Sequence, residues 1–98
     1  MREKSIEAKL VKAVKAKGGL ALKFVSPGMD GMPDRLVLMP DGNMCFVELK
    51  ADPKKKPRAL QLYRHKQLRE LGFKVFVVDV TEKINEVLLL MGGEDNGV

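Results

Sequence analysis

Apolar residues recur at helical spacing near the N-terminus. They are Ile6, Leu10, Ala13 and Val14. Residues at this spacing share one face of a helix, which buries against a core. Gly18 and Gly19 end the pattern, because glycine adopts the left-handed conformation that closes helices. A helix over residues 3–17 is therefore predicted.

Three apolar segments follow this helix and are predicted as strands. They cover residues 20–25, 34–39 and 44–51. A loop rich in glycine and proline, residues 26–33, separates the first two, and Pro40-Asp41-Gly42 joins the second to the third. The short connection predicts that the second and third strands form a hairpin.

The second half of the chain alternates helix, strand and helix. A polar connection leads to a predicted helix over residues 59–71, and a run rich in Val and Phe, residues 73–80, has the composition of a fully buried strand. Thr81 is placed to cap a last helix, after which residues 92–98 form a polar tail. The apolar positions of that helix are Ile84, Val87, Leu88 and Met91. The prediction is an α/β (α+β) fold with a mixed sheet, as one domain over residues 1–98 with its core at about 3–91.

The hairpin register decides which side chains share a face of the sheet. Pro40 suits the first central position of a type I turn, and Gly42 suits the left-handed position that ends a three-residue loop. This loop makes Met39 face Asn43, and counting back five pairs places Asp34 opposite Glu48. A two-residue type I′ turn would instead turn the two acids to opposite faces. We expect the first register.

In that register both faces of the hairpin are apolar. One face carries Leu36, Leu38, Met44 and Phe46, and the other carries Val37, Met39, Cys45, Val47 and Leu49. Apolar residues on both faces require covering elements on both sides of the sheet. Helices are therefore predicted on each side.

Composition limits the class of protein. The chain has 98 residues, of which 45% are hydrophobic and 32% charged, which suits one small globular domain. One cysteine excludes a disulfide framework and a cysteine-based zinc site, and no apolar run approaches the roughly 18 residues of a membrane span. The N-terminus leads into an amphipathic helix instead of a signal-peptide core, so an intracellular protein is expected. A formal charge of +5 favours a polyanionic partner.

Two acids and a lysine bracket the predicted hairpin. Asp34 and Glu48 offer carboxylate oxygens, which suit Mg²⁺ or Mn²⁺. Lys50 lies two residues beyond Glu48, so in a strand it points to the same face, where attacking water or a scissile phosphate would lie. Alternatively, Asp34 caps a loop and Glu48 is an exposed acid, but Glu48 stands among apolar residues, where an unpaired carboxylate is costly to bury.

A basic run follows the third strand. Its residues are Lys54, Lys55, Lys56 and Arg58. The run is either a solvated loop or a set of phosphate contacts, and Lys23 is a weaker candidate for such a contact. His65 is interpreted as a surface residue of the second helix.

These residues carry a family resemblance. The matching positions are Ser26-Pro27-Gly28, Gly31, Pro33-Asp34-Arg35, residues 46–50, Gln61, and residues 68–72 leading into the strand at 75–78. In their order and spacing over roughly residues 3–90, the chain resembles a stand-alone VRR-NUC domain, the virus-type replication-repair branch of the PD-(D/E)XK nucleases. The resemblance implies an αβββαβ core with a C-terminal helix.

The resemblance also implies a set of site residues for metal-dependent phosphodiester hydrolysis. It implies Asp34 and Glu48 as metal-binding acids, the main-chain carbonyl of Leu49 as a further ligand, Lys50 as the catalytic lysine, Gln61 as the glutamine that opens the second helix, and Glu7 as the helix-one acid. Glu3 lies one turn before Glu7, so the choice between them stays open.

Small stand-alone members of the family are similar to Holliday junction resolvases, act as homodimers, and many are phage-encoded. The implied partner is therefore DNA, branched or in four-way junctions, in the cytoplasm of a bacterial or phage-infected host cell. Two alternatives remain open from sequence. One is a noncatalytic basic DNA-binding or assembly module, and the other is a nuclease, including an RNase, without junction preference.

Overall fold

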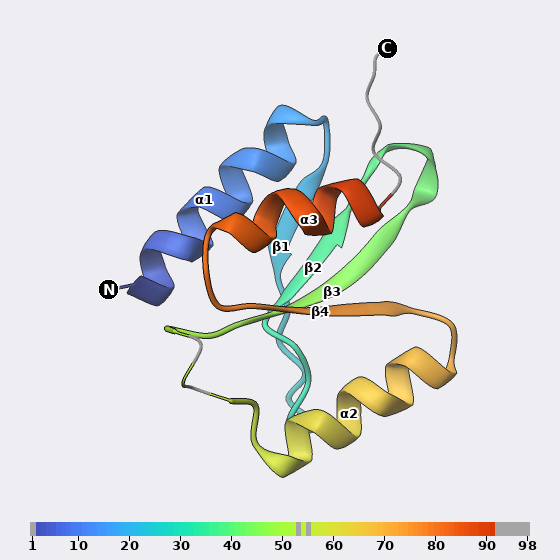
Figure 1. Cartoon of the computed structure of the whole chain (residues 1–98). Coiled ribbons are helices and arrows are strands. Elements are labelled where there is room, and N and C mark those ends of the chain that lie inside the picture. The colour runs from blue at the N-terminus through green and yellow to red at the C-terminus, as the bar shows by residue number, and fades with distance from the viewer. Residues whose placement is uncertain (1, 53, 55, 92–98) are drawn as a thin grey trace.

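The computed structural model describes residues 2–52, 54 and 56–91, in which a four-stranded sheet lies between helices (Figure 1). The elements are α1 (Arg2–Ala16), β1 (Leu20–Lys23), β2 (Arg35–Leu38), the 3-10 turn η1 (Pro40–Gly42), β3 (Met44–Leu49), α2 (Ala59–Glu70), β4 (Lys74–Val78) and α3 (Glu82–Leu90). The predicted order of helices and strands is confirmed. The polar tail predicted at residues 92–98 lies outside the described residues.

The strands lie in the order β1-β2-β3-β4. The first three are antiparallel neighbours, whereas β4 runs parallel to β3. A parallel pair needs a crossover connection, and α2 supplies it. The helix that crosses between β3 and β4 therefore lies against the strand that carries Glu48.

Two buried clusters lie on opposite faces of the sheet. Helices α1 and α3 cover one face and α2 lies on the other (Figure 1). The first cluster joins Ile6, Leu10, Val14, Val37, Met39, Cys45, Val47, Leu49, Val78, Ile84, Val87, Leu88 and Met91. The second joins Phe46, Leu68 and Val75, with Phe24, Met32, Leu36 and Met44 packed against it. The predicted covering of both faces is confirmed.

The hairpin has the predicted register. Leu36 pairs with Phe46, and the Met39 amide donates a 2.7 Å hydrogen bond to the Asn43 carbonyl. Continuing the pairing by one step past Arg35 and Val47 places Asp34 opposite Glu48.

The expected type I turn is wrong in one detail, because Asp41 is also left-handed (φ 67°), as is Gly42 (φ 79°). Aspartate tolerates this region better than most residues. Consecutive left-handed residues also match the right-handed twist of the paired strands.

Two other expectations are corrected. Strand β4 is not fully buried: Lys74 is exposed and Phe76 and Val77 are half-buried, because β4 lies at the edge of the sheet formed by the described strands, next to β3. Thr81 precedes α3, but its side chain makes no capping hydrogen bond. Its backbone is already helical, whereas a capping residue normally has extended geometry.

Within the described ranges, no helix has the length and apolar content needed to cross a membrane.

Candidate active site

Asp34 and Glu48 meet where β2 begins and β3 ends. Asp34 comes directly before β2 and is half-buried, whereas Glu48 lies within β3 with 1% of its surface exposed. Asp34 Oδ2 accepts a hydrogen bond of 2.8 Å from the Leu49 amide. This contact fixes the first carboxylate against the strand that carries the second.

Lys50 follows β3 and turns its side chain to the same place. Its amide donates to the Val78 carbonyl (3.0 Å), which keeps the backbone in line with the sheet. Its Nζ lies 3.4 Å from Glu48 Oε2 and donates a 3.1 Å hydrogen bond to Gln61 Oε1. The structure therefore brings together Asp34, Glu48 and Lys50.

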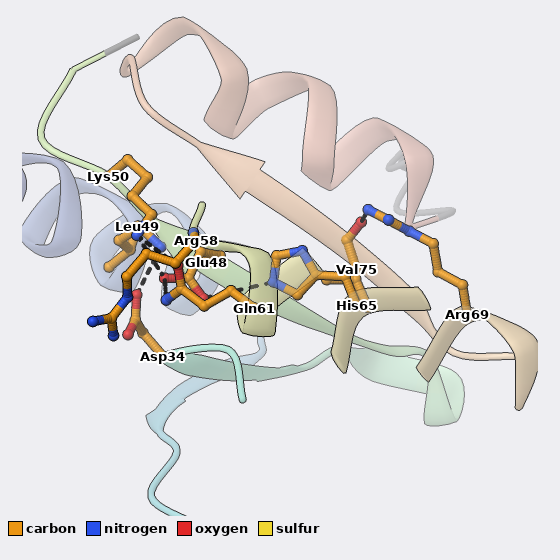
Figure 2. Close-up of polar contacts among 9 residues, drawn as sticks. All are labelled: Asp34, Glu48, Leu49, Lys50, Arg58, Gln61, His65, Arg69 and Val75. Carbon is orange, nitrogen blue, oxygen red and sulfur yellow. Dashed lines mark hydrogen bonds and ion pairs between the residues drawn. The ribbon is translucent and has the colours of Figure 1, made fainter. Parts of the chain in front are cut away.

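Gln61 connects these groups to α2, where it is the third residue. Its Oε1 accepts a 2.9 Å hydrogen bond from the Arg58 amide, which satisfies a free N–H at the start of the helix. Its Nε2 donates a 2.9 Å hydrogen bond to Glu48 Oε2 (Figure 2). At the other end of α2, the Arg69 guanidinium donates to the Val75 carbonyl at 2.7 Å. Both ends of the helix are thus fixed to the sheet.

The electrostatic environment of Glu48 is unfavourable to its charge. Burial, followed by repulsion from the Asp34 carboxylate, raises the pKa of Glu48 to about 7 despite the nearby Lys50 ammonium. Glu48 Oε1 is buried and, among the residues that the structure describes, has no hydrogen-bond partner. The two carboxylates of Asp34 and Glu48 therefore carry more negative charge than the Lys50 ammonium neutralises.

His65 belongs to this site, and its interpretation as a surface residue is wrong. Its side chain is 1% exposed, with Nε2 3.7 Å from Glu48 Oε1. Burial, together with the positive charges of Arg69 and Lys50, lowers the pKa of His65.

The sheet-facing side of α2 is formed by Gln61, His65 and Leu68, whereas Leu60, Leu62 and Tyr63 are exposed. In the sequence, this buried face is indicated by the i, i+4, i+7 spacing of its three residues. The positions of the apolar residues do not indicate it, because most of them lie on the solvent side of the helix.

Glu7 lies apart from these groups. Its carboxylate pairs with the Arg35 guanidinium, whose hydrogen bond is the main cause of the lowered pKa of Glu7. Arg35 also donates to the Ala21 carbonyl (3.0 Å), and Lys23 faces Arg35 across β1 and β2. Among the described residues, no hydrogen bond or ion pair joins Glu7 to the Asp34–Glu48 pair.

The basic run borders the site. Lys54, Lys56 and Arg58 are exposed, and the Lys54 amide donates to Asp52 Oδ1 at 2.8 Å. Lys55, predicted as part of the same run, lies outside the described residues. The described part of the run lies in the connection from β3 to α2, and the Arg58 amide at its end contacts the Gln61 side chain.

Within the described residues, no three His, Cys, Asp or Glu side chains cluster as a ready-made metal cage. The candidate site contains two acids, Asp34 and Glu48. Mg²⁺ is commonly bound through one or two carboxylates together with water and substrate oxygens. Two facing carboxylates therefore fit a site that the substrate completes.

Comparisons with known proteins bear on this geometry. No family model matches the chain. The chain is 53% identical over 79 residues to the "Putative nuclease p44" of Acyrthosiphon pisum secondary endosymbiont phage 1, covering 81% of this chain and 84% of that protein. A solved VRR_NUC domain superposes with a TM-score of 0.86 at 34% identity, covering 91% of this chain and 96% of that one. Sequence and fold agree, and the chain belongs to the VRR-NUC family of nucleases.

Proposed function

We propose that the protein is a DNA endonuclease that depends on Mg²⁺ or Mn²⁺. The observation that supports this most directly is the position of Asp34 opposite Glu48, with the Lys50 ammonium 3.4 Å from the Glu48 carboxylate. Two acids that repel each other, with a cation at their side, are suited to a divalent metal and an anionic substrate.

The donor set fits such a metal. Asp34, Glu48 and the Leu49 main-chain carbonyl would hold it through oxygen, the ligand type that Mg²⁺ and Mn²⁺ prefer. The raised pKa of Glu48, caused by burial and by the Asp34 carboxylate, indicates a carboxylate whose negative charge the Lys50 ammonium does not fully compensate. Glu7 is a candidate for a second metal or its water, a role that requires its pair with Arg35 to open.

When bound, the metal would polarise the scissile phosphate and acidify a coordinated water. Lys50 would orient the attacking water and stabilise the negative charge that develops on the phosphate. Gln61 holds the Lys50 ammonium and the Glu48 carboxylate in one arrangement through its two side-chain atoms. A covalent intermediate through Cys45 is disfavoured, because its side chain is buried and burial raises the pKa of the thiol to about 12.

Charge supports a nucleic-acid substrate. The formal charge is +5, and Lys54, Lys56 and Arg58 are exposed cations in the connection between Lys50 and Gln61. We assign this run, with Lys55, to phosphate contacts that hold the DNA backbone without reading sequence. Lys23, beside Arg35 and Glu7, is a weaker candidate for the same role.

For the finer substrate we propose four-way or otherwise branched DNA, cut by a homodimer in the cytoplasm of a bacterial or phage-infected cell. Each chain carries one Asp34–Glu48 pair, so symmetric cutting of two opposing strands needs two chains related by a two-fold axis. Two chains in a dimer would have exposed apolar side chains to bury, including Met29 in the loop before β2, and Leu89 and Leu90 at the end of α3. Met32, in the same loop as Met29, packs against the second core cluster.

The test is a cleavage panel. Four-way junction, flap, duplex, single-stranded DNA and RNA substrates are incubated with Mg²⁺, Mn²⁺ or EDTA. We expect cleavage of junctions with either metal and none with EDTA. Cleavage that persists in EDTA would contradict metal dependence, and equal cutting of duplex and junction would contradict branched-DNA specificity alone.

A further inference from the structure

The contact between α2 and Glu48 leaves buried polar atoms unpaired. Glu48 Oε1, His65 Nδ1 and His65 Nε2 are buried without a hydrogen-bond partner in the described part of the chain. Native proteins pair the large majority of such atoms, so each exception calls for an explanation. Two of the three face each other, since Nε2 lies 3.7 Å from Oε1, a little beyond hydrogen-bonding distance.

Two residues of α2 lie next to different oxygens of the Glu48 carboxylate. Gln61 and His65 are four residues apart on α2 and therefore project from the same face. Gln61 Nε2 donates to Oε2, and His65 Nε2 is aligned with Oε1, as the dashed lines in Figure 2 show. The oxygen bound by Gln61 is also the one next to the Lys50 ammonium.

We propose that His65 is a positioning residue for Glu48: its Nε2–H donates to Oε1 and holds the carboxylate in the orientation that metal binding requires. This role rests on the proposed metal-dependent function. Nε2 and Oε1 lie 3.7 Å apart, so a shift of about 0.5 Å brings this pair within hydrogen-bonding distance. Outer partners of this kind orient ligating groups and are a large part of metal affinity.

A packing role for His65 makes the opposite prediction. If the ring only fills space, an apolar side chain of similar size serves as well, because it removes two unpaired polar atoms from the interior. Substitutions that keep or lose the donor at the Nε2 position separate the two roles. Glutamine places its amide nitrogen near the position of Nε2, whereas asparagine places it near Nδ1.

The experiment measures Mn²⁺ affinity, by titration calorimetry or by the paramagnetic resonance of free Mn²⁺, for the full chain and three variants. We expect His65→Leu and His65→Asn to weaken Mn²⁺ binding by about 10- to 100-fold and His65→Gln to stay within about threefold of wild type. Cleavage of a junction substrate should follow the same order. Far-UV circular dichroism establishes that each variant is folded at the temperature used.

Leu68→Ala is the matched control. Leu68 is buried on the same face of α2 and belongs to the second core cluster, so its truncation loosens the helix without removing a donor to Glu48. We expect it to lower thermal stability and leave the Mn²⁺ affinity of the folded protein unchanged. If His65→Leu does not fold, the comparison of His65→Gln with His65→Asn still decides the question.

The outcomes separate the two proposals. Normal Mn²⁺ affinity in His65→Leu, equal affinity in the Gln and Asn variants, or an equal loss in Leu68→Ala would overturn the positioning role alone. A wild-type chain that binds no Mn²⁺, or binding that Glu48→Gln leaves unchanged, would instead overturn the proposed metal site and the role of His65 with it.

Discussion

Gln61 Nε2 donates a hydrogen bond of 2.9 Å to Glu48 Oε2, which joins the crossover helix α2 to the strand that carries a candidate metal ligand. The same Gln61 side chain accepts from the Arg58 amide and from Lys50 Nζ. One residue therefore starts the helix and orders two charged groups of the site. Any shift at the start of α2 would be transmitted directly to Glu48 and Lys50.

Asp34→Asn and Glu48→Gln are expected to abolish metal binding and cleavage while preserving the fold. Each change removes a charged ligand without removing volume. The loss of activity should exceed about 100-fold, the upper end found for residues that only support ligands. Calorimetric titration with Mn²⁺ and a junction-cleavage assay measure the two effects. Wild-type rates in both variants would show that the acids are assigned wrongly.

Gln61→Leu should reduce cleavage by about 10- to 100-fold, because it leaves Glu48 and Lys50 without their shared partner. It should also lower the melting temperature, because the Arg58 amide loses its acceptor at the start of α2. Gln67→Leu is the matched control: Gln67 is half-buried on the same helix and accepts a hydrogen bond from Arg64. An equal loss of activity in both variants would assign Gln61 a purely structural role.

The metal-free protein should become less stable as the pH rises through neutrality. The pKa of Glu48 is raised from 4.5 to about 7 in the fold, so the folded state holds this proton more tightly than the unfolded chain. Stability from this source is fully present below pH 4.5 and is lost as the pH rises through 7. Between pH 6.5 and 8.5 the loss is about 1 kcal/mol.

Urea unfolding of the metal-free chain at several pH values measures this loss, and Glu48→Gln is expected to remove it. The lowered pKa of His65 has the opposite effect, because its contribution to stability is lost as the pH falls through 6.5. Glu48→Gln retains His65, so the difference between the two chains isolates Glu48. Saturating Mn²⁺ should reverse the trend above pH 7, since the metal favours the ionised carboxylate. Identical pH dependence in wild type and Glu48→Gln would count against the assignment.

Neutralising the basic run should weaken DNA binding for all sequences. For Lys54→Gln combined with Lys56→Gln, the slope of log affinity against log salt should fall by up to about 2, because each lost phosphate contact releases about 0.9 fewer counterions. Lys12→Gln combined with Lys15→Gln, exposed on α1 across the sheet, is the control of equal charge. Fluorescence anisotropy at several salt concentrations gives the slopes. Equal slopes in the two double variants would return the run to a solvated loop.

The chain should be a dimer at micromolar concentration. Light scattering is expected to give twice the chain mass, and mixing wild type with an excess of Glu48→Gln should convert paired junction cuts into single-strand nicks. The mixed dimer retains one active site, which explains the nick. A monomeric mass together with unchanged paired cutting would exclude the dimeric resolvase model and leave the nuclease assignment intact.

The order of elements could be read from the sequence because it depends on local signals. The helical spacing of apolar residues from Ile6 to Val14 indicates the first helix, and Gly18, whose φ is 85°, follows its end. The choice of a three-residue loop at Pro40–Gly42 over a two-residue turn placed Asp34 opposite Glu48, since a hairpin register follows from the number of loop residues. The position of Asp34 opposite Glu48 was therefore predictable from spacing, whereas the roles of these acids and of Lys50 rest on the family resemblance.

Tertiary structure alone decided which face of α2 meets the sheet. Gln61 is buried with its amide bonded to Glu48, and His65 is buried with its Nε2 3.7 Å from the same carboxylate, while Leu60 and Leu62 remain exposed. A hydrophobic pattern cannot report such a choice, because it ranks side chains by their transfer from water and not by the partners available. The pairing of Glu7 with Arg35 is likewise a contact across 28 residues that no local signal encodes. Chain spacing thus predicted that Asp34 lies opposite Glu48, and packing between distant elements determined which residues surround this pair.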